Sequence, residues 1–129
     1  MEYCVNIEVS NGEFLDKISI LEIKMKLIAN DKQKKNIEKE YYYLLGQMNG
    51  LLDSKKIREL YQELKSVNQK LWNIEDAVRF KEKHQTFDDE FIDLARNVYK
   101  TNDHRSKIKK KINQISESNF TEEKSYESY

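Results

Sequence analysis

The sequence predicts an all-α fold, a bundle of four to five long helices preceded by one short β-strand. The 129 residues include no proline and only three glycines, so the residues that most often interrupt helices are nearly absent. Apolar residues recur at alternating spacings of three and four over most of the chain, which is the period of an amphipathic helix. The length supports one domain, expected at residues 1–118, with a polar tail at residues 119–129.

Residues 2–9 are predicted to form the strand, because every second side chain is apolar: Tyr3, Val5, Ile7 and Val9. A single strand leaves its backbone N–H and C=O groups without partners. We therefore expect it to pair with the same strand of a second copy, which makes the protein a homodimer, or to pack as an extended, solvated arm.

The first two helices are predicted at residues 13–29 and 31–48. The first has apolar stripes on two opposite sides, which is typical of a helix packed between others in the core. Asp16 lies in line with the second of these stripes. The second helix is expected to end at the pair Asn49-Gly50, a good C-terminal signal.

The third helix is expected to be the longest, from a cap at Asp53 or Ser54 to about residue 83. Its apolar seam keeps heptad spacing, which predicts a helical hairpin or coiled-coil contact. The seam consists of Ile57, Leu60, Leu64, Val67, Leu71, Ile74 and Val78.

A fourth helix is expected to begin after a cap at Thr86. Its apolar stripe is interrupted by Thr101 and Arg105. Two alternatives follow: a fifth helix capped by Asn102 or Asp103, or one continuous helix in which Arg105 points inward.

Composition argues against several classes of protein. The 23 basic and 23 acidic residues give a formal net charge of zero, which disfavours binding to nucleic acid or to an anionic membrane. Cys4 is the single cysteine, and no apolar run approaches the length that spans a bilayer, so we expect a soluble cytoplasmic protein.

We predict no cofactor and no bound metal. The pairs Glu13/Asp16 and Glu90/Asp93 each place two carboxylates on one helix face, an arrangement found in magnesium sites. Both pairs lie in first helical turns, where the helix dipole favours acids, and the Glu-x-x-Glu motif of the helical pyrophosphohydrolases is absent.

The candidate ligand site lies beside the seam of the third helix, where an aromatic ring, a carboxylate and a guanidinium share one face. If the fourth helix turns its own polar residues inward, the two arginines could bind a phosphate or carboxylate next to a stacking ring. The alternative is a partly buried ion-pair network that holds the helices in register. The candidate residues are Trp72, Glu75, Arg79, Tyr99, Asn102 and Arg105.

The segment from His104 to Lys111 is locally basic. We interpret it as a solvated helix end whose charge the acidic tail neutralises. Binding of nucleic acid is the less favoured interpretation, because aromatic residues are not interleaved with the basic ones.

Several segments in order along the chain resemble a family of small bacterial and phage proteins of unknown function. The segments are residues 10–24, 68–72, 74–76, 91–99, 102–103, 112–113 and 122–126, together with Arg79 and Arg105. The resemblance implies that some relatives are encoded near glycosyltransferase or surface-polysaccharide genes, and it implies no particular activity.

Two functional hypotheses remain. The first is a cytoplasmic helical binding or assembly module that contacts a protein partner or a small anionic ligand. The second is a small enzyme acting on a phosphorylated or nucleotide-sugar substrate, with Glu75, Arg79 and Arg105 around a cleft near Trp72.

Overall fold

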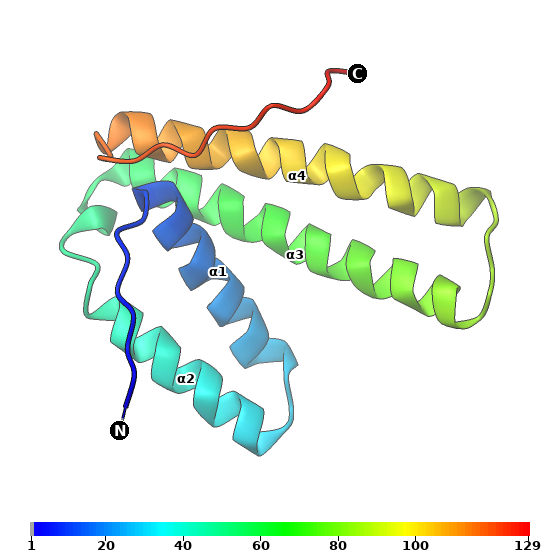
Figure 1. Ribbon diagram of the computed structural model, residues 1–129, viewed down its shortest axis with the longest axis horizontal. Helices are drawn as coiled ribbons and strands as arrows, with labels where there is room; N and C mark the ends of the chain where they lie inside the picture. Colours follow the sequence, from blue (N-terminus) through cyan, green and yellow to red (C-terminus); the bar gives the residue numbers. More distant parts are fainter. Residues whose placement is uncertain (1) are drawn as a thin grey trace.

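The computed structural model describes residues 2–129, which form four α-helices and one short 3-10 helix. The α-helices are α1 (Asn11–Leu27), α2 (Asp31–Leu45), α3 (Lys55–Lys83) and α4 (Asp89–Ile115), and η1 (Leu51–Asp53) precedes α3. They form two antiparallel hairpins, α1 with α2 and α3 with α4, and α1 contacts the other three helices (Figure 1). The predicted helical bundle is therefore confirmed.

The core lies where α1 packs into one half of the α3–α4 hairpin. Its buried residues come from three helices, and α2 adds half-buried side chains at its edge. The predicted seam of α3 is buried from Ile57 to Ile74. The core residues are Leu15, Ile18, Ile57, Leu60, Tyr61, Leu64, Val67, Ile108 and Ile112.

The predicted strand at residues 2–9 is not formed, and this part of the fold prediction is corrected. Residues 2–10 are neither helix nor strand, and Tyr3, Val5 and Ile7 are exposed. Alternation defines a pleated surface only when a neighbouring strand pairs with the backbone, and residues 2–129 contain no strand.

The fourth helix is continuous through Asn102 and Asp103, so no fifth α-helix forms within residues 2–129. It begins later than predicted: Asp88, not Thr86, is its N-cap and accepts a hydrogen bond from the Phe91 N–H at 2.9 Å. The hydroxyl of Thr86 instead donates to the carbonyl of His84. The second helix also ends earlier than predicted, at Leu45.

Gly12 lets α1 start in direct contact with α4. A Cβ at this position would lie 2.5 Å from the carbonyl oxygen of Lys109, so any larger residue would push the helices apart. The Gly12 N–H donates to Asn113 Oδ1 at 2.7 Å, and Asn11 is bonded to Ser116 and Ser118. The start of α1 is thereby attached to the end of α4.

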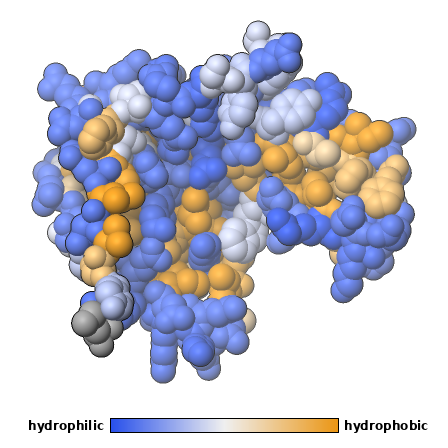
Figure 2. Space-filling model, viewed as in Figure 1, coloured by the Kyte–Doolittle hydropathy of each residue, from blue (hydrophilic) through white to orange (hydrophobic). Residues whose placement is uncertain are grey.

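The far half of the α3–α4 hairpin extends beyond α1 and α2 (Figure 1). Figure 2 shows apolar residues on the surface toward the end of this hairpin and in the hollow between the two hairpins. The C-terminal segment, residues 116–129, returns along the outer side of α4.

Candidate functional site

A buried carboxylate, Asp16 of α1, lies where α1, α3 and α4 meet. Both of its oxygens accept hydrogen bonds from the guanidinium of Arg105 on α4, one of them from Nε at 2.9 Å. Asn68 Nδ2 on α3 donates to Asp16 Oδ1 at 2.8 Å and to the hydroxyl of Ser19 at 2.7 Å. Asp16 therefore links three helices through charge-assisted hydrogen bonds.

Arg105 is the inward-pointing residue that one of the two sequence alternatives requires. Its pKa is raised above the ordinary value, first by the hydrogen bond to Asp16, although partial burial acts in the opposite direction. Asn102 accepts a further hydrogen bond from Arg105 at 3.3 Å. The guanidinium is thus engaged by the protein's own groups.

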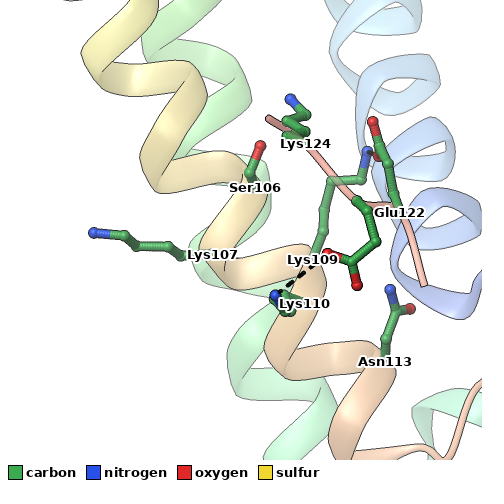
Figure 3. A pocket seen from close by; sticks show the side chains of 8 residues that line it. Ser106, Lys107, Lys109, Lys110, Asn113, Glu122 and Lys124 are labelled. Atoms are coloured by element: carbon green, nitrogen blue, oxygen red, sulfur yellow. Dashed lines mark hydrogen bonds and ion pairs between the residues drawn. The ribbon is translucent and has the colours of Figure 1, made fainter. Parts of the chain in front are cut away.

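Lys109, one turn beyond Arg105 on α4, lies between two carboxylates. Its Nζ is 3.9 Å from Asp16 Oδ2 and 3.0 Å from Glu122 Oε2 on the C-terminal segment. Figure 3 shows Lys109 extending toward Glu122, with Asn113 a turn away and Lys107 pointing in another direction. The pKa of Glu122 is lowered, chiefly by this hydrogen bond.

Three of the six candidate residues, Trp72, Glu75 and Arg79, line one groove between α1 and α3. Its volume is about 320 Å³. Arg79 Nε lies 3.5 Å from Glu75 Oε2; the Arg79 side chain is largely exposed and that of Glu75 is about half exposed. The other lining residues are Ile20, Ile23, Asn68 and Asp76.

The other three candidates, Tyr99, Asn102 and Arg105, lie on α4 away from that groove. Tyr99 packs edge-to-face on Tyr129 of the C-terminal segment, at 5.4 Å between ring centroids. Arg105 is bound to Asp16, so it does not meet Arg79 in the Trp72 groove. The structure brings the six residues together as two groups, not as one anion-binding cleft.

A second polar cluster surrounds Glu22 on α1. Its carboxylate accepts hydrogen bonds from Tyr61 at 2.6 Å, Lys65 at 2.6 Å and Tyr41 at 3.3 Å. Burial raises the pKa of Glu22, but the hydrogen bonds from Lys65 and Tyr61 outweigh burial and the net shift is downward. Burial and the bond to Glu22 raise the pKa of Tyr61 far above its ordinary value. This cluster attaches α2 and α3 to α1.

Within residues 2–129, no group of three or more His, Cys, Asp or Glu side chains is placed to hold a metal ion. Asp16 is occupied by Arg105, and Glu13 lies on the first turn of α1. None of the described helices is both long enough and apolar enough to cross a membrane.

The profile of a family of unknown function, DUF6165, matches residues 5–129. The chain belongs to this family. No curated protein and no solved structure matches it. The resemblance found in the sequence, to a family of unknown function over nearly the whole chain, is confirmed to that extent.

In this DUF6165 chain, sequence reasoning did not identify Asp16, Lys109 and Glu122 as members of one network. A signal for Asp16 existed, since an acid in line with an apolar stripe must find a cation or a polar group when the helix is buried. The predicted neutralisation of the basic segment by the acidic tail is confirmed by the Lys109–Glu122 and Lys110–Glu123 pairs. The charged runs gave no signal for which lysine would meet which glutamate.

Proposed function

We propose that this DUF6165 protein is a cytoplasmic assembly module that forms a homodimer through the far half of the α3–α4 hairpin. The observation that carries this proposal is the burial pattern of residues 75–100, which we call the arm. No residue of the arm is buried, although it carries Val78, Phe80, Phe87, Phe91 and Leu94. Two helices packed only on each other leave much of their apolar surface accessible to water. Further packing against another element is therefore needed for a stable core.

The uncovered surface continues the surface on which α1 packs. On α4, steps of three and four lead from Arg105, which contacts α1, through Asn102 to Val98, Ala95 and Phe91. These positions lie on one side of the helix, and α1 covers the Arg105 end. Val98 and Asn102 also border a pocket on the side of the C-terminal segment, whereas Ala95 and Phe91 lie beyond it.

On α3, the same kind of steps lead from Asn68, which also contacts α1, to the three candidate residues of the groove. All six uncovered positions are only partly buried, apart from the exposed Arg79. We call this surface the open face: Trp72, Glu75, Arg79, Phe91, Ala95 and Val98.

Charge complementarity favours a second copy of the chain as the occupant of the open face. Along α3 the acidic Glu75 and Asp76 precede the basic Arg79 and Lys83, and along α4 acidic residues 88–90 and 93 precede Arg96 and Lys100. When two copies run antiparallel about a twofold axis, each acidic cluster faces a basic cluster of the other copy.

This dimer would be a four-helix bundle of coiled-coil type, with the end of each arm beside the other copy's Trp72 groove. The exposed side chains of Phe80 and Phe87 near that end supply apolar surface for the contact. The Glu75–Arg79 pair is long and solvated, so exchanging it for pairs between copies costs little. The single cysteine and the resemblance to bacterial and phage proteins agree with a cytoplasmic location in such a cell.

A charge-exchange experiment tests the proposal by light scattering after size exclusion. The wild type is expected at twice the 15.5 kDa chain mass. Glu75→Arg alone and Arg79→Glu alone each place like charges opposite each other, which should raise the dimer Kd about tenfold or more. An equimolar mixture of the two variants restores opposite charges and should return to the dimer mass.

Two substitutions on α4 serve as a matched pair. Ala95→Glu introduces a charge on the open face and should produce monomer, whereas Asn97→Glu, two residues further along α4 and therefore on the opposite side of the helix, is at an exposed position and should leave the dimer intact. A wild-type monomer at all accessible concentrations would exclude the homodimer. A mixture of the charge variants that stays monomeric would show that another partner covers the arm.

A further inference from the structure

A small cavity between α4 and the C-terminal segment concentrates cations around two carboxylates. Its volume is about 150 Å³. Four of its eight lining residues are lysines, and both acidic ones come from the C-terminal segment. The lining residues are Ser106, Lys107, Lys109, Lys110, Asn113, Glu122, Glu123 and Lys124. The cavity is separate from the open face that forms the proposed dimer.

Lys109 is the least exposed cation of the cavity, with 13% of its side chain accessible. Its near neighbour inside the core, Asp16, already accepts hydrogen bonds from Arg105 on both oxygens and from Asn68 on one. At 3.9 Å, Asp16 contributes attraction but no hydrogen bond to Lys109. The hydrogen-bonded anion at Lys109 is therefore Glu122.

The segment that carries Glu122 is attached by solvent-exposed contacts. Every residue from 119 to 129 is exposed, and the segment has neither helix nor strand. Lys110 lies 3.8 Å from Glu123, and Tyr129 donates to Asp103 at 2.5 Å. Exposed contacts such as these contribute little to stability, so the segment is held mainly by the Lys109–Glu122 pair. Glu122 itself is 47% accessible, so a ligand can reach Lys109 by displacing it.

The part of the cavity formed by α4 offers donors suited to a tetrahedral oxyanion. Lys109 and Lys110 supply ammonium groups, and Ser106 supplies a hydroxyl. Asn113 uses its Oδ1 to accept from the Gly12 N–H, which directs its amide nitrogen to other acceptors. These donors belong to one helix that the bond from Gly12 holds in place, so the site exists before a ligand arrives.

We propose that this cavity binds a phosphate group, as inorganic phosphate or a phosphomonoester, and that Glu122 occupies the place of the phosphate when none is bound. A phosphomonoester carries close to two negative charges at neutral pH. Its two charges equal those of Glu122 and Glu123 combined, so the bound phosphate neutralises Lys109 and Lys110 as the two glutamates do. The C-terminal segment and the phosphate compete for the same ammonium group.

The test is titration of the ¹⁵N-labelled full-length chain with sodium phosphate at constant ionic strength, followed by NMR. Phosphate is expected to shift the amides of residues 106–113 and to move those of residues 122–124 toward random-coil positions. The double variant Glu122→Gln/Glu123→Gln removes the competing carboxylates and should tighten the phosphate Kd about tenfold. This factor is expected if the C-terminal segment occupies the site in about nine-tenths of the wild-type molecules. Glu127→Gln removes one negative charge from the same segment without touching Lys109 and should leave the Kd unchanged.

The lysines provide the second arm of the test. In the chain with both glutamates replaced, Lys109→Gln should weaken phosphate binding at least about tenfold, whereas Lys107→Gln, which points away in Figure 3, should change it less than about twofold. Circular dichroism checks the fold, and Lys110→Gln replaces Lys109→Gln if the latter does not fold. Tighter binding of glycerol 3-phosphate than of inorganic phosphate would identify an esterified ligand, and the reverse order free phosphate.

Two results would overturn the proposal. One is an equal phosphate Kd for the wild type and the chain without Glu122 and Glu123, because the segment would then not compete. The other is a Kd unaffected by replacing Lys109 or Lys110 in a folded chain. The dimer and this site are tested separately, since the charge-exchange variants leave every residue of the cavity in place.

Discussion

Arg105 stands at a position where an apolar residue would have continued the stripe of α4. It is accommodated because Asp16 on α1 presents both carboxylate oxygens to it and Asn102 receives a third N–H. Burying either charge alone would cost free energy, so Arg105 on α4 needs Asp16 on α1 and Asp16 needs Arg105. The pair also fixes how far α1 is rotated and translated against α4.

Asp16→Asn is expected to lower the free energy of unfolding by about 2–3 kcal/mol, because it leaves a partly buried guanidinium without its anion. The value lies below the loss for a fully buried pair because 27% of the Arg105 side chain remains accessible. Urea denaturation at neutral pH measures this change. Glu40→Gln breaks the exposed Lys17–Glu40 pair and should cost less than about 1 kcal/mol. Equal losses for the two variants would contradict a structural role for the Asp16–Arg105 pair.

At the scale of the elements, α2 depends on α1 for its position. It buries no residue of its own, and among the described helices its backbone approaches that of α1 but not that of α3 or α4, so it meets the core only through half-buried side chains. The hydrogen bond from Tyr41 of α2 to Glu22 of α1 joins a cluster that also holds Tyr61 and Lys65 of α3. Three helices therefore share one carboxylate.

The lowered pKa of Glu22 makes the attachment of α2 sensitive to acid. The folded-state pKa lies below the ordinary value of 4.5, so the stabilisation is present above that value and is lost as the pH falls through the folded-state pKa. Wild type should therefore lose more of its unfolding free energy between roughly pH 5 and pH 3 than Glu22→Gln, which has no proton to gain there. Urea midpoints across this range measure the difference. Parallel curves for the two chains would show that Glu22 does not couple to folding.

At the scale of the whole molecule, stability is distributed unevenly along the α3–α4 hairpin. One half is buried under α1, and the arm at residues 75–100 has no buried residue. Local opening free energies follow the density of buried contacts, so the arm should open far more readily than the core.

Hydrogen exchange of the monomeric Arg79→Glu chain should reveal this division. Amides of residues 75–83 and 91–100 are expected to exchange at least about tenfold faster than those of residues 57–71. In the wild-type chain, raising the protein concentration should slow exchange in the arm and leave residues 57–67 unchanged, because dimer formation covers the arm and the neighbouring Trp72 groove but not the buried part of α3 before it. Uniform protection along α3 in the monomeric variant would contradict this division of the hairpin.

Much of the fold could be predicted from local signals. Capping and apolar spacing depend on residues that are close together in the sequence, and they located α3 through the cap at Ser54 and the seam from Ile57 to Ile74. The absence of proline agreed with long helices. The exceptions are instructive: Thr86 and Asp88 are both good caps, and only the path of the loop decides between them. The strand at residues 2–9 failed because strand formation needs a partner that no local pattern supplies.

The sequence by itself determined which residues share a helix face, since the helical period depends only on spacing along the chain. It therefore grouped Trp72, Glu75 and Arg79 correctly, and it allowed Arg105 to point inward. Only the tertiary structure decided which faces meet. Asp16 finds Asn68 and Arg105 at sequence separations of 52 and 89 residues, and such contacts depend on how α1 crosses both helices of the hairpin. Periodicity carries no information on that crossing, because it is set by side-chain packing and by close approaches such as the one at Gly12.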